Sequence, residues 1–331
     1  MEIHFPTYYN TFRCIAADCP DSCCKEWTVD VDPASAAHYR ALDGALGDRL
    51  RAVLQDTEGG TIMTIENGRC PMWREDSLCR IQAELGHDAL CKTCRDFPRL
   101  RHDYGDFTEL GLELSCPEAA RLILTAAPDM QLEILPGENT PEYDSADMEI
   151  LKTSRQNILN LLDNDSFTLP EVLAVLLLYA HDVQAQIDGM DATTFMPDML
   201  LDDAKRYAAE GNLPGVFNFF CGLEILTQEW SLRLQQAPRP IQWSATLRAL
   251  ARYMVNRYWL QAVSDLDLIC RAKFIIIACI LVGALGGDPI RTAQLFSKEI
   301  ENNPDNVEAI LDGAYTATAL TDTNLFSILL G

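Results

Sequence analysis

The sequence predicts a mainly α-helical protein, in which a small, irregular, cysteine-rich α+β domain that binds metal precedes an all-α domain. Three observations lead to this prediction. Nine of the 12 cysteines lie within the first 116 residues, where the strand and turn patterns are short. The rest of the chain consists of long segments whose apolar residues recur with helical spacing. A length of 331 residues is also sufficient for two domains.

Short elements are expected in the cysteine-rich part. Alternating apolar residues predict strands, and Asp32 followed by Pro33 is typical of the start of a helix. The Asn67–Gly68 pair is a strong turn signal. The expected elements are, in order, a strand over 27–32, a helix over 34–55, a strand over 61–66, a short helix or turn over 80–90, a strand over 107–114 and a helix that begins at Cys116–Pro117.

Proline and glycine residues over 127–145 indicate a linker, which places the cysteine-rich domain at 1–126 and the helical domain at 146–331. The longest apolar run, from Phe274 to Leu285, is too short to cross a bilayer and is typical of a buried core helix. Helical periodicity beyond the linker predicts helices near 146–163, 169–187, 193–210, 215–235, 241–262, 266–285, 290–302 and 306–313.

The charge of the chain restricts its partners. It carries 26 Lys and Arg against 49 Asp and Glu, a net charge of −23. Nucleic acids and anionic membrane surfaces are bound by clustered basic residues, so neither is an expected partner. The amino terminus has no basic segment followed by an apolar run, which a signal peptide requires. We therefore expect a cytoplasmic protein.

The clustered cysteines predict metal or redox chemistry, because cytoplasmic thiols stay reduced. A structural zinc ion or a cubane cluster is usually held by four thiolates. Nine cysteines are enough for two such sites with one left over, or for one site with several to spare, and their spacing leaves both arrangements open. Only Cys91 and Cys94 have the two-residue spacing of a zinc knuckle, so the pattern of a paired zinc ribbon is absent.

Four blocks of this region resemble a family of zinc- or iron-chelating cysteine-cluster domains, and within it the flagellin lysine-N-methylases. The blocks are Cys14 to Cys24, Asn67 to Pro71 with Leu78 to Gly86, Cys94 to Arg99 with its Cys-x-x-Phe-Pro signature, and Ser115 to Arg121. The resemblance implies an enzyme that transfers methyl groups from S-adenosylmethionine to lysines of flagellin or another lysine-rich protein. It also implies a thiolate-bound iron–sulfur (4Fe-4S) cluster, with zinc as the alternative.

The resemblance selects eight metal ligands and leaves Cys91 unmatched. The eight are Cys14, Cys19, Cys23, Cys24, Cys70, Cys79, Cys94 and Cys116. A non-enzymatic metal-binding module and an electron-transfer module remain the alternatives to a methyltransferase.

Lysine methylation requires a neutral amine, although free lysine has a pKa of about 10.4. A carboxylate placed against the amine can accept its proton. Three carboxylates near the cysteine motifs are the candidate catalytic residues: Glu26, Asp96 and Glu118. Aromatic faces can hold a sulfonium cation and arginines can bind a carboxylate, which makes Tyr8, Trp27, Arg95 and Arg99 the candidate cofactor-binding residues.

Overall fold

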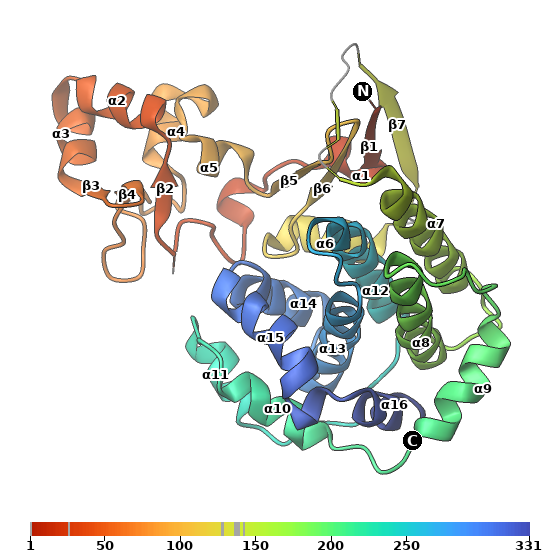
Figure 1. Ribbon diagram of the computed structural model, residues 1–331. Helices are drawn as coiled ribbons and strands as arrows, with labels where there is room; N and C mark the ends of the chain where they lie inside the picture. Colours follow the sequence, from red (N-terminus) through yellow and green to blue (C-terminus); the bar gives the residue numbers. More distant parts are fainter. Residues whose placement is uncertain (1, 26, 127–128, 136–139, 142) are drawn as a thin grey trace.

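The structure is a computed structural model that describes residues 2–25, 27–126, 129–135, 140–141 and 143–331. It contains a cysteine-rich lobe and a larger helical body, which Figure 1 shows side by side. Each has its own hydrophobic core. The predicted mainly α-helical fold with a small β component is confirmed.

The lobe consists of short elements around a small core. The core contains Tyr39, Leu50 and Met72 among its buried residues. An antiparallel three-stranded sheet, in the order β2-β4-β3, forms one side of the lobe. The elements are η1 (Ala16–Asp18), β2 (Val29–Val31), α2 (Pro33–Ala41), α3 (Gly44–Val53), β3 (Leu54–Thr57), β4 (Gly60–Met63), α4 (Arg80–Leu85), η2 (His87–Ala89) and α5 (Lys92–Asp96).

The single helix predicted over 34–55 is wrong, because the chain forms α2 and α3 there and enters β3 at Leu54. Gly44 has a φ of +78° at the break, in the left-handed region that an α-helix cannot continue through. The predicted start of α2 is confirmed, since the Asp32 carboxylate accepts a hydrogen bond from the Ser35 amide at 3.0 Å.

A second sheet joins the lobe to the helical body. Its strand order is β5-β6-β1-β7, with β1 parallel to β6 and antiparallel to β7. The segments are β1 (Glu2–Pro6), α1 (Thr7–Thr11), β5 (Arg99–Asp103), β6 (Phe107–Leu112) and β7 (Met130–Ile134). The sequence pattern did not indicate β1, β5 or β7, and β7 lies inside the expected linker over 127–145. Pairing between β1 and β6 links residues about 105 positions apart, as Glu2 lies opposite Phe107.

The helical body surrounds α13, which is buried along almost its whole length. Helices α8, α12, α14 and α15 pack against it (Figure 1). Among the residues that the structure describes, none of the helices combines the length and the apolar character needed to cross a membrane. The helical elements are α6 (Pro117–Thr125), α7 (Ser145–Leu162), α8 (Leu169–Ile187), α9 (Pro197–Tyr207), α10 (Leu213–Cys221), α11 (Gln228–Leu234), α12 (Ala245–Tyr258), η3 (Trp259–Ser264), α13 (Ile269–Leu285), α14 (Pro289–Phe296), η4 (Ser297–Glu301), α15 (Pro304–Thr316), η5 (Thr318–Leu320) and α16 (Asp322–Leu330).

Two further differences concern the helical part. The helix predicted over 215–235 is wrong as a single element, because α10 ends at Cys221 and α11 begins at Gln228. The last helix, α16, was not predicted at all. The cores also divide the chain differently from the expected boundary at residue 126, since α6 and Phe107 belong to the core of the helical body.

Candidate metal centre

Seven of the nine amino-terminal cysteines meet where the lobe contacts the helical body, and the other two, Cys70 and Cys91, are buried in the core of the lobe. Three of the nine occupy equivalent local positions, because Cys79, Cys91 and Cys116 directly precede α4, α5 and α6. Amide groups in the first turns of these helices donate hydrogen bonds to the three thiols. Such donors favour the thiolate form that binds metal.

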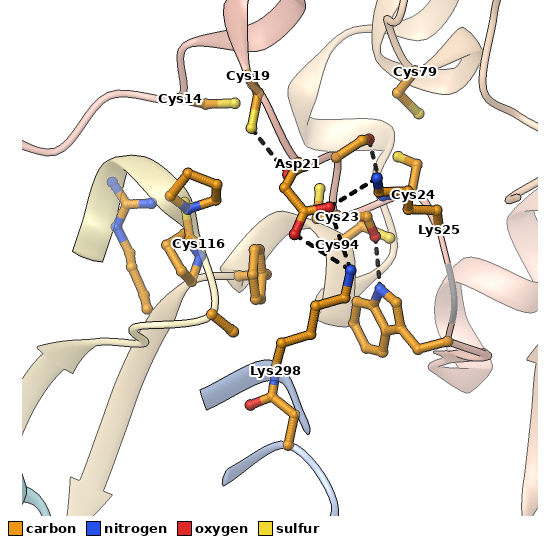
Figure 2. Close-up of a pocket in the computed structure, with 18 of the residues that line it drawn as sticks. Cys14, Cys19, Asp21, Cys23, Cys24, Lys25, Cys79, Cys94, Cys116 and Lys298 are labelled. Carbon is orange, nitrogen blue, oxygen red and sulfur yellow. Dashed lines mark hydrogen bonds and ion pairs between the residues drawn. The ribbon is translucent and has the colours of Figure 1, made fainter. Parts of the chain in front are cut away.

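A large cavity opens between the lobe and the helical body, with a volume of about 580 Å³. This lies within the range of small-molecule sites in proteins. Figure 2 shows thiols on several sides of it and Lys298 entering from the helical body. Seven cysteines line it, namely Cys14, Cys19, Cys23, Cys24, Cys79, Cys94 and Cys116.

A small cavity of about 20 Å³ lies inside the lobe. Its wall combines thiols with apolar side chains of the lobe core, including Tyr39 and Met72. Six cysteines line it, namely Cys23, Cys24, Cys70, Cys79, Cys91 and Cys94. Cys91, which the family resemblance left unmatched, is 2% exposed and contacts this cavity.

Burial keeps several of these thiols protonated. It raises the pKa of Cys70 to about 12 and that of Cys116 to about 11. Cys24 and Cys91 behave differently, because hydrogen bonds with the Cys23 and Cys94 thiols lower the pKa of each to about 7. Metal ligands must be thiolates, so loading this region with metal would release protons.

The donor set is suited to a soft metal. Thiolates select zinc and iron–sulfur clusters over magnesium or calcium, which prefer oxygen ligands. Within the described part of the chain, no three His, Cys, Asp or Glu side chains already converge closely enough to hold one ion. The residues therefore match a thiolate-bound metal in chemistry, although their side chains do not surround a single point.

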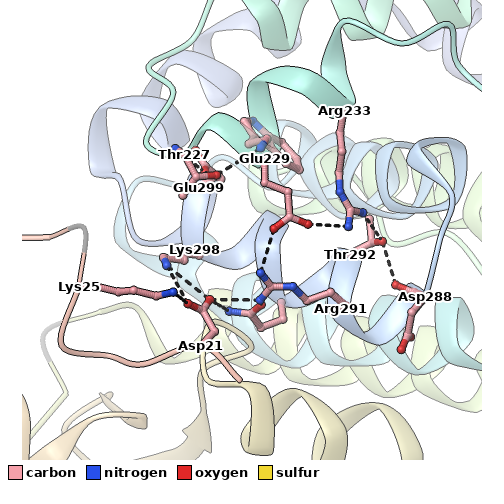
Figure 3. Close-up of polar contacts among 12 residues, drawn as sticks. Asp21, Lys25, Thr227, Glu229, Arg233, Asp288, Arg291, Thr292, Lys298 and Glu299 are labelled. Atoms are coloured by element: carbon pink, nitrogen blue, oxygen red, sulfur yellow. Dashed lines mark hydrogen bonds and ion pairs between the residues drawn. The ribbon is translucent and has the colours of Figure 1, made fainter. Parts of the chain in front are cut away.

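A buried ion-pair network attaches the cysteine-bearing loop to the helical body (Figure 3). The carboxylate of Asp21, between Cys19 and Cys23, accepts from Lys25 at 2.9 Å, Arg291 at 3.1 Å and Lys298 at 3.3 Å. Burial opposes ionisation of Asp21, but these cations and a hydrogen bond from Gln294 hold its pKa at about 2. A permanent negative charge thus joins segments 270 residues apart in sequence.

Three of the four predicted cofactor-binding residues line the large cavity: Trp27, Arg95 and Arg99. The Trp27 indole N–H donates to the Cys23 carbonyl at 2.7 Å, and its ring lies 6.1 Å from the ring of Phe97. Tyr8 instead lines a separate cavity of about 320 Å³, beside β5 and α12.

Two of the three predicted catalytic carboxylates lie within the described residues, and neither of them lines the large cavity. Glu118 forms two hydrogen bonds with Arg121, at 2.6 and 2.8 Å, in the first turn of α6. Asp96 lies beside Arg95, at 3.5 Å, and is also absent from the lining. Glu26 lies outside the described residues.

Sequence reasoning missed the contribution of the helical body. Glu224, Glu299, Lys298, Asn302 and Asn303 all line the large cavity. They lie more than 100 residues after the last cysteine motif, and no pattern in the sequence connects them to it. The ion pairs of Asp21 with α14 and η4, and the hydrogen bond from Gln294 to the Ser115 carbonyl, hold this surface against the cysteines.

Comparison with known proteins gives partial matches. The Lysine-N-methylase of Salmonella typhimurium is 32% identical over 166 residues, which cover 47% of this chain and 40% of that protein. The Lysine-N-methylase of Salmonella choleraesuis matches to the same extent. This chain therefore spans about two fifths of the length of these relatives.

The flagellar biosynthetic protein FliU of Salmonella muenchen is 34% identical over 137 residues, which cover 38% of this chain and 79% of FliU. No family model matches the chain. No solved structure matches it either. Because four fifths of FliU aligns at this identity, the chain belongs to the FliU and lysine-N-methylase family, which is the family that its cysteine motifs predict.

Proposed function

We propose that this protein is an S-adenosylmethionine-dependent protein-lysine N-methyltransferase with a thiolate-bound iron–sulfur cluster. One observation carries the proposal: a cavity large enough for a cofactor is lined by seven thiols together with aromatic and basic side chains. The names of its relatives support methyl transfer to lysine. The FliU relative supports flagellin as the protein substrate.

Cys14, Cys19, Cys23 and Cys116 are the residues that would hold the cluster. Each lines the large cavity, and their thiols are close enough to influence one another electrostatically. A 4Fe-4S cluster bound by all four thiolates would leave no iron open to the cofactor, so the cofactor would bind beside the cluster and not to it.

The cofactor would lie beside Trp27, Phe97 and Arg99. A sulfonium carries a positive charge, and the faces of aromatic rings attract cations. The Arg99 guanidinium is itself held 5.3 Å from the centre of the Phe12 ring, at the cavity wall. Arginine can bind a carboxylate with two parallel hydrogen bonds, and Arg99 would bind the carboxylate of the cofactor in this way.

Glu224 is the best-placed carboxylate for the incoming lysine. It is exposed at the cavity and is oriented by a hydrogen bond from the Asn303 amide at 2.9 Å. The other two carboxylates of the lining are occupied, Asp21 by its cations and Glu299 by the Thr227 hydroxyl and two amides. An exposed carboxylate attracts the lysine ammonium, and the net charge of −23 favours its approach.

Direct transfer requires the amine to lose its proton and align its lone pair with the methyl carbon, opposite the sulfonium sulfur. The new C–N bond forms as the C–S bond breaks, and the electron pair of that bond leaves on the sulfur. Most of the rate enhancement in such a reaction comes from positioning. Glu224 and the aromatic wall would supply this alignment from the two sides of the cavity.

The test starts with protein purified without air. We expect about four iron and four sulfide per chain, binding of S-adenosylmethionine in calorimetry, and methylated flagellin lysines in mass spectrometry. Cys116→Ser should abolish iron binding, whereas Cys221→Ser, at an exposed thiol that does not line the cavity, should retain it. If the purified protein contains no iron, does not bind the cofactor and does not transfer methyl groups, the proposal is refuted. The alternative, a non-enzymatic metal-binding module, would then explain the cysteines.

A further inference from the structure

The nine thiols lie in two kinds of surroundings, and four of the thiols line both cavities. Cys70 and Cys91 are buried in the core of the lobe, and Cys24 and Cys79 pack against that core. Cys14, Cys19 and Cys116 line only the large cavity. Cys23 lines both cavities and hydrogen-bonds with the Cys24 thiol, but it also lies within reach of the charges of Cys14 and Cys116, and we assign it to the group of the large cavity.

The size of the small cavity limits what it can hold. About 10–15 Å³ of such space is needed for one water molecule. A cavity of about 20 Å³ therefore accommodates a single particle of that size, and not a cluster of several irons and sulfides. An ion surrounded by four thiolates in a closed, apolar setting is the usual arrangement of structural zinc.

The backbone already holds the buried thiols near one another. The Cys70 amide donates a hydrogen bond to the Cys24 carbonyl at 2.7 Å. The backbone of Cys79 pairs with that of Trp73 in an isolated antiparallel β-bridge. The Tyr39 hydroxyl, which lines the same cavity, donates to the Ala89 carbonyl at 2.7 Å, two residues before Cys91. The Cys70 thiol also lies close enough to sense the charges of the Cys24, Cys79 and Cys91 thiols, although these four thiols do not yet converge on one point.

We propose that Cys24, Cys70, Cys79 and Cys91 form a closed zinc site, distinct from the open thiol group of the large cavity. The two sites are adjacent, since four thiols line both cavities: Cys23, Cys24, Cys79 and Cys94. The zinc site is independent of methyl transfer: it crosslinks four segments of a lobe whose own elements are short. It also gives Cys91 a role that the sequence motifs did not.

The test measures bound metal in chains expressed with both zinc and iron and purified without air. We expect one zinc per chain, and an X-ray absorption spectrum with four sulfur neighbours at about 2.3 Å from the zinc. A wild-type protein without zinc, or zinc bound mainly by oxygen and nitrogen, overturns the proposal. This measurement needs no variant and does not depend on folding of a mutant.

Matched variants separate the two sites. Cys91→Ser should lose at least nine tenths of the zinc, whereas Cys116→Ser should retain zinc and lose iron, and Cys221→Ser should retain both. Equal loss of zinc in the Cys91 and Cys116 variants would show one shared site and refute the division. If zinc behaves as expected but no methyl transfer is found, the zinc site stands and the proposed activity fails.

Discussion

Asp21 offers the most direct test of how the cysteine loop is attached to the helical body. Its carboxylate is 4% exposed and faces Lys25, Arg291 and Lys298. Asp21→Asn keeps the shape of the side chain and removes its charge. The variant therefore leaves three cations around a neutral amide in a largely buried position.

The magnitude follows from two considerations. Lowering the pKa of Asp21 from 3.8 to about 2 corresponds to about 2 kcal/mol, at 1.36 kcal/mol per pKa unit. Removal of one partner from a buried ion pair costs about 3–5 kcal/mol. In the variant, Arg291 would still have Glu229 as an ion-pair partner at 3.0 Å. The expected loss therefore lies at or below the lower end of this range. We expect Asp21→Asn to reduce the free energy of unfolding by about 2–3 kcal/mol.

Urea unfolding followed by tryptophan fluorescence measures this loss, and hydrogen exchange over residues 19–25 locates it. The control is Asp56→Asn, because Asp56 is 71% exposed and its ion pair with Arg40 at 2.6 Å is a surface one. Such pairs contribute about 0–1 kcal/mol. Equal stability of the two variants, with unchanged exchange in the loop, would refute the view that Asp21 anchors it.

Three further predictions concern other parts of the molecule. Burial opposes ionisation of Asp322, but hydrogen bonds from His181 and Lys273 lower its pKa to about 2. Its contribution to stability is therefore complete above the ordinary pKa of 3.8 and is lost as the pH falls toward 2. Asp322→Asn should flatten that part of a curve of stability against pH, and an unchanged curve would contradict this prediction. Glu224→Gln should raise the KM for flagellin about tenfold with a smaller change in kcat, in steady-state methylation assays; an effect on kcat alone would point to a different role. Trp27→Ala should weaken binding of S-adenosylmethionine about fivefold while Trp27→Phe retains most of it, as calorimetry can measure, and equal affinity of all three proteins excludes a cation–π contact.

Local signals in the sequence predicted the parts of the fold that depend on neighbouring residues. Asp288 caps α14 through the Ile290 amide at 2.9 Å, as Asp288 followed by Pro289 indicates. The apolar run from Phe274 to Leu285 lies buried in α13. Both patterns report on contacts within one helix or one face, which is why they can be recognised without knowledge of the tertiary structure.

Contacts between distant segments could not be predicted in the same way. Strand β1 owes its conformation to β6 and β7, more than 100 residues later. Glu224 and Lys298 reach the cysteines through contacts between distant segments, such as the ion pairs of Asp21 with α14 and η4. No local motif marks these residues in the sequence. The prediction therefore selected carboxylates that are near the cysteines along the chain, and it missed those that line the cavity.

The two cores explain why the thiols would serve two purposes. The core of the lobe is built from few large apolar side chains, whereas the helical body surrounds the buried and largely apolar α13. Small domains with little core depend on metals or disulfides for stability. A closed zinc site inside the lobe would provide that stability while the thiols of the large cavity remain accessible from outside. A site that admits a cofactor and a protein lysine cannot also be the closed crosslink of its own domain, and a zinc ion that binds Cys70 and Cys91, which line only the small cavity, would separate these two roles.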